Sequence, residues 1–218
     1  MIGISSRCIG CRKEWVQFPI EHGFSFIEIN HAWTDFQFNK NKLEQFKQTA
    51  IDNNLKLSFH TEGTAFADSN PLIKKQQIST LKAELYAANY IGCKYFVVHP
   101  PRGATFEENP TEINNFFTTV TELSKDCSPQ VVVENDAKGY WSREKNLIRI
   151  FQSFPQLKMN LDIGHLNRAL NEGTKTTAKH FVKTFANKII YTHIHDSQGI
   201  KSDHFALGKG TARKIIPL

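Results

Sequence analysis

Residues 157–165 read LKMNLDIGH, and residues 130–136 read QVVVEND. Each segment is a short apolar run that reaches a carboxylate, Asp162 in the first and Glu134 in the second. Near-continuous β-branched and aromatic residues, without strict alternation, are typical of strands that are covered by helices. Runs of the same kind predict seven strands in all, at 2–5, 24–30, 55–60, 94–99, 130–135, 157–162 and 189–195.

Helical patterns separate these runs. The segment 71–91 places Leu72, Leu81 and Leu85 on one apolar stripe. The predicted helices are 40–53, 71–91, 110–125, 142–154 and 177–187. Strands that each lead into a helix predict one α/β domain with a parallel sheet over residues 1–218.

Two architectures fit this alternation, a doubly wound open sheet and a (β/α)8 barrel. The open sheet should carry a phosphate loop of the form GxGxxG or GxxxxGK[ST] after its first strand, and the sequence has neither. The barrel is favoured because almost every predicted strand ends in a metal-ligating residue type, and in a barrel these ends meet at one face. These residues are Glu28, Asn30, His60, His99, Glu134, Asp162, His165, His193 and His195, and the next loop adds Asp203 and His204.

Any one of these histidines can instead be a hydrogen-bonded structural residue. Carboxylates at the ends of apolar strands, however, are costly to bury without a partner. A divalent metal ion is a partner that several carboxylates and neutral imidazoles can share. The pattern as a whole therefore predicts a metal site, and it does not distinguish Zn²⁺, Mn²⁺, Mg²⁺ and Co²⁺.

The composition is that of a globular protein. The chain has 218 residues, 40% of them hydrophobic, and a net charge of +6 from 27 Lys and Arg against 21 Asp and Glu, which excludes a disordered chain. No run approaches the about 18–20 apolar residues of a membrane span, and no signal peptide is evident. We expect a soluble cytoplasmic protein without a membrane partner. The basic residues are scattered, which does not favour a nucleic-acid surface.

Six segments together resemble the xylose-isomerase-like barrel superfamily. They are LSFHTEG (57–63), FVVHPP (96–101), VVVEND (131–136), NLDIGH (160–165), THIHD (192–196) and DHFALGKG (203–210). This superfamily holds sugar and sugar-phosphate isomerases and epimerases, together with endonuclease IV-type AP endonucleases (AP endonuclease family 2). The resemblance extends from about Ile2 to Gly210 and implies a TIM-barrel fold.

The family closes its barrel with an eighth strand that carries another metal-binding glutamate. Here the sequence ends at Leu218, where the helix before that strand would start. We therefore expect a barrel that lacks the eighth strand. An open sheet edge of this kind favours association, so a homo-oligomer is a further expectation.

The resemblance also implies roles for individual residues. The ligands of the central metal would be Glu134, Asp162 and His193. In members with several metals, His60 and His99 would share Glu134 at a second ion. His165 and His204, with an acidic neighbour, would hold a third.

In the sugar isomerases one ion suffices, and the histidine at position 165 tends to contact substrate. His193 and His195 lie two residues apart and share a strand face, so their spacing alone does not choose between them as ligands. The H-x-x-D pattern of the family selects His193 as the ligand, and His195 is the alternative ligand. The predicted substrate-binding residues are His165, His195 and Lys209, the last of which could meet a phosphate.

Three functions follow from this reading. The first is a metal-dependent isomerase or epimerase of a sugar or sugar phosphate, which moves a proton through an enediolate with Glu134 as catalytic base. The second is a phosphodiesterase at abasic DNA sites, and only this alternative requires a nucleic-acid partner. The third is a degenerate barrel that binds a metal or a sugar without turnover.

Overall fold

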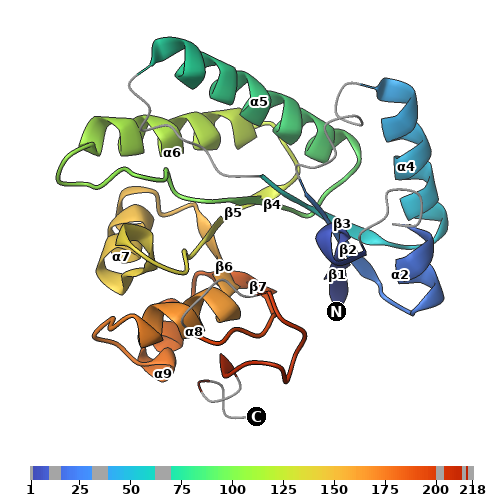
Figure 1. Cartoon of the computed structure of the whole chain (residues 1–218). Coiled ribbons are helices and arrows are strands. Elements are labelled where there is room, and N and C mark those ends of the chain that lie inside the picture. Colours follow the sequence, from blue (N-terminus) through green and yellow to red (C-terminus); the bar gives the residue numbers. More distant parts are fainter. Residues whose placement is uncertain are drawn as a thin grey trace. The chain divides into compact units, whose positions relative to one another are not determined.

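The computed structural model describes residues 2–9, 16–30, 39–61, 70–199, 204–212 and 215. Along the chain, strands alternate with helices from the blue N-terminal end to the red C-terminal end (Figure 1). The chain divides into two compact units. The first comprises Met1–Arg102 and Thr118–Val131, and the second comprises Gly103–Phe117 and Val132–Leu218.

The first unit contains four neighbouring parallel strands in chain order. These are β1 (Gly3–Ser5), β2 (Phe26–Asn30), β3 (Lys56–His60) and β4 (Tyr95–Val98). Its helices are α1 (Ser6–Ile9), α2 (Gln17–Glu21), α4 (Lys40–Asp52) and α5 (Pro71–Tyr90). One boundary between the two units lies between Arg102 and Gly103, and the other two lie within helix α6 (Pro110–Ser124) and strand β5 (Gln130–Glu134).

Strands β2, β3 and β4 of the first unit are largely buried, as their near-continuous apolar sequences predict, whereas the residues of β1 are exposed or half-buried. All five residues of β2 are buried, and the rings of Phe59 on β3 and Phe96 on β4 stack with centroids 5.8 Å apart. Helix α5 contributes Leu81 and Leu85 to this core. The prediction that Leu72 lies on the buried stripe is wrong, because Leu72, near the start of α5, is 75% exposed.

The second unit contains the remaining strands, again parallel and in chain order. Strand β5 pairs with β6 (Lys158–Asp162), and β6 pairs with β7 (Ile189–His193). The other elements are the 3-10 helix η2 (Tyr140–Ser142) and the helices α7 (Glu144–Ser153), α8 (Ile163–Asn171) and α9 (Ala178–Thr184). The core is made of fully buried side chains that include Phe116, Val132, Ile150, Met159 and Phe181.

Helix α8 was not among the predicted helices. It begins directly after β6, without a connecting loop, so the sequence pattern of the strand merges with that of the helix. Asp162 is both the last residue of β6 and the N-cap of α8, and its carboxylate accepts a hydrogen bond from the backbone N–H of His165 at 2.7 Å. An aspartate that precedes a helical segment is a strong start signal. The segment DIGH therefore contains its own helix start.

The seven predicted strands are confirmed, with ends that shift by one or two residues. Strand β7 stops at His193, two residues before its predicted end, and none of its residues is buried. Within the described part of the chain, no eighth strand occurs and no strand pairs with the outer edge of β7. The helices described there are all too short or too polar to cross a membrane.

Candidate metal centre

Three neighbouring strands of the second unit end in residues predicted to bind a metal. Glu134 is the last residue of β5, Asp162 of β6 and His193 of β7. In the sheet, Asp162 lies opposite His193, and Glu134 lies opposite Asn160, which is two residues before Asp162. The two carboxylates are only 1–2% exposed. The register thus places two buried acids and one imidazole at one end of this sheet.

The distances between these side chains are those of groups that can share a partner. His193 Nδ1 lies 3.1 Å from Glu134 Oε2 and 3.6 Å from Asp162 Oδ2. Atoms that bind one ion at about 2.1 Å are themselves about 3.0–3.5 Å apart. His193 Nδ1 therefore lies at about ligand-to-ligand spacing from each of the two carboxylates.

His165 approaches the same carboxylates from the first turn of α8. Its Nδ1 lies 2.9 Å from the carbonyl oxygen of Asn135 and 3.2 Å from Glu134 Oε1. One ligand atom from each of Glu134, Asp162 and His165 can be chosen so that all lie within 4.8 Å of one another. Because a carbonyl oxygen only accepts hydrogen bonds, Nδ1 of His165 carries a proton and Nε2 is the nitrogen available to a ligand.

His195 contacts Asp162 from the segment after β7. Its Nε2 lies 2.9 Å from Asp162 Oδ1 and 3.1 Å from Oδ2, and its Nδ1 lies 3.1 Å from the carbonyl oxygen of Asp196. Both ring nitrogens of His195 therefore face oxygen atoms. His195 was predicted to bind substrate, and the structure shows its two polar atoms engaged within the protein.

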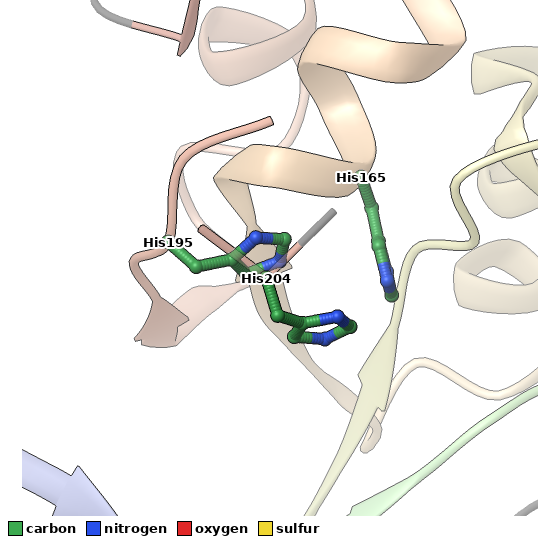
Figure 2. Close-up of side chains that lie close together, drawn as sticks. All are labelled: His165, His195 and His204. Atoms are coloured by element: carbon green, nitrogen blue, oxygen red, sulfur yellow. The ribbon is translucent and has the colours of Figure 1, made fainter. Parts of the chain in front are cut away.

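Figure 2 shows His165, His195 and His204 as a group, and their ligand atoms lie within 4.8 Å of one another. The rings of His195 and His204 are stacked, with centroids 4.2 Å apart and planes 18° from parallel. The lone pair of an imidazole nitrogen lies in the plane of its ring, so two stacked rings do not direct their lone pairs at one point. His195 and His204 in this arrangement form a packing contact rather than a shared coordination site. Asp203, predicted beside His204, lies outside the described residues.

Two buried asparagines complete the surroundings of the acids, and sequence reasoning missed both. Asn160 Nδ2 donates to Glu134 Oε2 at 2.9 Å and lies 3.0 Å from His193 Nδ1. Asn135 exchanges two hydrogen bonds with the backbone of Asp162, at 2.9 and 3.0 Å. Asn160 precedes Asp162 by two residues and so shares its strand face, which is the signal that could have identified it.

Asp196 organises the loop that follows β7. Its carboxylate accepts hydrogen bonds at 2.9 Å from the backbone N–H groups of Ser197, Gly208 and Ala212. Burial raises the pKa of Asp196, but the backbone N–H groups that bond to it, that of Gly210 included, lower its pKa more. Lys209 lies on this loop and is exposed. The aspartate of the H-x-x-D pattern therefore holds the glycine-containing loop that presents Lys209.

The histidines predicted for a second ion lie in the first unit. His60 ends β3 and His99 follows β4, and both side chains are largely buried. Their rings meet edge to face with centroids 5.1 Å apart. Glu28 and Asn30 of β2 are also buried in this unit. The proximity of His60 and His99 agrees with a shared role, and their sharing of Glu134 stays a prediction.

The acids and imidazoles of the second unit shift one another's pKa values. Burial lowers the pKa of His165, but the negative charge of Asp162 and the hydrogen bond to Glu134 raise it more, to about 9. Burial raises the pKa of Asp162, but the charge of His165 and hydrogen bonds from His193 and His195 bring it well below its usual range. For His195, burial also lowers the pKa, and the contact with Asp162 raises it overall. A cluster that holds protons on its imidazoles in this way must release them when a metal binds.

These shifts predict how the stability of the metal-free protein depends on pH. The folded pKa of His165 lies above its unfolded value of about 6.5, so its stabilising contribution is complete below about pH 6.5 and is lost as the pH rises through about 9. The contribution of Asp162 is present above its unfolded pKa of about 4 and is lost as the pH falls. We expect the EDTA-treated protein to be most stable near pH 4–6.5. Its free energy of unfolding should fall towards pH 9, by on the order of 3 kcal/mol from His165, and its melting temperature should fall with it.

Thermal melts of the EDTA-treated protein between pH 4 and 9 measure this effect. The variant His165→Gln cannot titrate at this position and should show a flatter profile between pH 6.5 and 9. An equally steep decline in that variant would mean that other groups cause the pH dependence.

The fold and the site together define a class of protein, namely α/β chains of the TIM-barrel type whose parallel strands end in carboxylates and imidazoles. Residues 17–218 match the family described as "Xylose isomerase-like TIM barrel". The chain therefore belongs to this family. The resemblance inferred from its motifs is confirmed, and so is the TIM-barrel fold class.

Solved structures agree with this assignment. A D-tagatose 3-epimerase-like protein is 23% identical with a TM-score of 0.79, and the match covers 95% of this chain and 80% of that one. Endonuclease IV from Thermus thermophilus is 19% identical with a TM-score of 0.69, and the match covers 98% of this chain and 84% of that one. At these identities the likeness establishes the fold, and it includes both enzyme types that the sequence suggested.

Two uncharacterised proteins of Methanocaldococcus jannaschii are also similar. One is 26% identical over 147 residues, which are 63% of this chain and 54% of that protein. The other is 26% identical over 213 residues, which are 89% of this chain and 69% of that protein. The chain thus spans about half the length of the first of these relatives.

Proposed function

We propose that this protein is a metal-dependent isomerase or epimerase of a sugar or sugar phosphate. The observation that carries the proposal is the position of Glu134, a buried carboxylate whose oxygens lie 3.2 Å from His165 Nδ1 and 3.1 Å from His193 Nδ1, beside a second buried acid, Asp162. Two carboxylates in an apolar sheet need a cationic partner. A D-tagatose 3-epimerase-like protein and D-psicose 3-epimerases share the fold, which supports this reaction class.

The donor set fits a divalent ion. The ligands would be Glu134, Asp162 and His193, two carboxylates and an imidazole, a set that suits Zn²⁺, Mn²⁺, Mg²⁺ or Co²⁺. When bound, such an ion polarises the oxygens of a substrate and acidifies the adjacent C–H bond. The hydrogen bond from Asn160 to Glu134 Oε2 holds the glutamate in the orientation seen here.

Three residues of the chain have proposed roles in proton transfer and in substrate binding. Glu134 is the proposed base, which removes a proton from the carbon next to the substrate carbonyl and returns it through an enediolate. His165 keeps Nδ1 on the Asn135 carbonyl and offers Nε2 to a substrate hydroxyl. Lys209, exposed on the loop held by Asp196, would pair with the phosphate of a phosphorylated substrate.

Hydrogen exchange into the substrate tests this function. The protein, loaded with Mn²⁺ or Co²⁺, is incubated in D₂O with ketoses and ketose phosphates, and the carbon-bound deuterium is measured by NMR. A proton-transfer enzyme incorporates deuterium next to the carbonyl of its substrate, and Glu134→Gln should not. If no member of the panel exchanges while the ion is bound stoichiometrically, proton transfer on these sugars is excluded.

A second candidate is a phosphodiesterase that acts at abasic sites in DNA. It is favoured by the contact between His60 and His99, which would serve an additional ion, and by the net charge of +6. Several metal ions can generate hydroxide and stabilise the leaving oxygen of a phosphodiester. Endonuclease IV from Thermus thermophilus shares the fold.

Metal content and DNA binding separate the two candidates. Two or three tightly held zinc ions, cleavage of an oligonucleotide with an abasic site, and affinity that falls steeply with salt would favour the nuclease. One exchangeable ion and no affinity for DNA would favour the isomerase. Binding of a metal or a sugar without either reaction would identify a degenerate barrel.

A further inference from the structure

The ring of His195 contacts several groups of the second unit through both of its nitrogens and one of its faces. Its Nε2 faces the carboxylate of Asp162 at 2.9 Å, and its Nδ1 faces the carbonyl oxygen of Asp196 at 3.1 Å. One face of the ring stacks on His204 with centroids 4.2 Å apart. Its side chain is only 12% exposed. A ring fixed by two hydrogen bonds and a stacking contact has essentially one orientation.

Gly164 is a further neighbour of the ring, and its missing side chain leaves the space that the ring occupies. A Cβ atom built at Gly164 would lie 2.0 Å from Cε1, 2.4 Å from Nδ1 and 2.6 Å from Nε2 of His195. The ring thus lies directly against the backbone of the first turn of α8. Gly164 does not adopt a positive φ, so its backbone conformation would tolerate alanine. The need for glycine here comes from the ring of His195 and not from the helix.

From these contacts we infer that Gly164 and His195 form a matched pair, in which His195 is a positioning residue that orients the carboxylate of Asp162 for the metal. This inference rests on the proposed metal centre. It assigns His195 to neither of the roles that its sequence position suggested, a metal ligand in reserve or a substrate contact.

The two oxygens of Asp162 show how this works. Oδ1 accepts from the backbone N–H of His165 at 2.7 Å, and His195 Nε2 lies 2.9 Å from Oδ1 and 3.1 Å from Oδ2. Oδ2 is the oxygen that faces His193 Nδ1, at 3.6 Å. The backbone N–H of His165 on Oδ1 and the His195 ring nitrogen, which contacts both oxygens, together fix the rotation of the carboxylate, with Oδ2 towards His193. Groups that orient a metal ligand in this way are worth about 10–100-fold in metal affinity.

The contact between His195 and Asp196 extends this arrangement to the loop after β7. The backbone carbonyl of Asp196 holds His195, while its carboxylate holds Ser197, Gly208 and Ala212. The orientation of Asp162 is therefore coupled, through one imidazole, to the segment that carries Lys209. This gives the H-I-H-D segment a physical reason for a second histidine.

A double-mutant cycle in the full chain tests the inference. The variants are Gly164→Ala, His195→Ala and the double variant, and the probe is Co²⁺, whose affinity is measured by calorimetry and whose ligand field is measured by visible absorption. Gly164→Ala and His195→Ala should each weaken Co²⁺ binding about 10–100-fold and change the absorption bands in the same way. The double variant should bind no more weakly than His195→Ala alone, since the ring that alanine displaces is already gone.

Two further variants separate positioning from a general loss of structure. His195→Gln retains an N–H donor on a side chain of similar reach and should restore part of the affinity. His180→Ala removes a histidine of α9 that pairs with Glu144 at 3.1 Å, and it should leave Co²⁺ affinity and absorption unchanged. The melting temperature of the double variant should equal or exceed that of His195→Ala, because alanine favours helix more than glycine does.

The outcomes distinguish the inference from the proposed function. If the wild-type chain binds Co²⁺ and His195→Ala binds it equally well, the positioning role is wrong and the metal centre stands. Independent, multiplicative losses from Gly164→Ala and His195→Ala would refute the matched pair. A wild-type chain that binds no divalent ion would overturn the metal centre itself, and the positioning role of His195 with it.

Discussion

Replacing Glu134 with glutamine is expected to abolish turnover, with a loss of at least about 10²–10⁴-fold from removal of the base alone. The amide also weakens the metal site, because it is a poorer ligand than a carboxylate. In the native structure Glu134 Oε2 accepts from Asn160 Nδ2 at 2.9 Å, and both oxygens lie within 3.2 Å of an imidazole nitrogen. In Glu134→Gln, the NH₂ group of the glutamine would face an N–H donor, either that of Asn160 or that of His165.

The measurements are initial rates on the substrate identified by deuterium exchange and the metal content after dialysis. Glu172→Gln is the matched control, since Glu172 belongs to the same unit and forms a salt bridge with Arg168 at 3.0 Å. It should retain wild-type rates and metal content. Turnover that persists in Glu134→Gln at full metal occupancy would require a different base, and unchanged metal content would remove Glu134 from the ligand set.

The second large effect is expected for stability, when Asp196 is replaced with alanine. The Asp196 carboxylate accepts three backbone hydrogen bonds at 2.9 Å, from Ser197, Gly208 and Ala212, and it is 2% exposed. A hydrogen bond to a charged group contributes about 1.5–3 kcal/mol, but these three form one network whose effects do not simply add. We expect a loss of about 3 kcal/mol, which corresponds to roughly 6–12 °C in melting temperature.

Circular dichroism melts of the metal-free protein measure this loss. The control is Asp126→Ala, an exposed aspartate between α6 and β5, which should change the free energy of unfolding by less than about 0.5 kcal/mol. One kcal/mol of unfolding free energy corresponds to about 2–4 °C in melting temperature for a chain of this size. A melting temperature for Asp196→Ala within about 2 °C of wild type would therefore show that the loop does not depend on this carboxylate.

The strands could be predicted because each depends on its own residues. Three consecutive valines at 131–133 predict a strand that is buried on both faces, and all three are buried here. The ends of strands were less certain, since a strand stops where its pairing stops. Asp162 illustrates this limit, because one residue ends β6 and caps α8, and the sequence pattern showed only the strand.

The candidate ligands could be listed from the sequence, but their roles could not be separated. His193 and His195 are two residues apart and chemically identical, and spacing did not choose between them. In the structure β7 ends between them, so His193 faces both Glu134 and Asp162 whereas His195 turns to Asp162 and the Asp196 carbonyl. Which histidine meets which acid depends on where pairing with β6 ends, and that is a property of the sheet.

By itself, then, the sequence determined the alternation of strands and helices, the polar residues at the strand ends and the family to which the chain belongs, because these depend on local residue patterns. Only the tertiary structure decided the supporting contacts, namely the hydrogen bond of Asn160 to Glu134, the carboxylate of Asp196 on its loop and the ring of His195 against Gly164. These contacts join residues that are 12 to 31 positions apart. Their geometry is set by strand register and by the absence of one Cβ atom, neither of which leaves a periodic signal in the sequence.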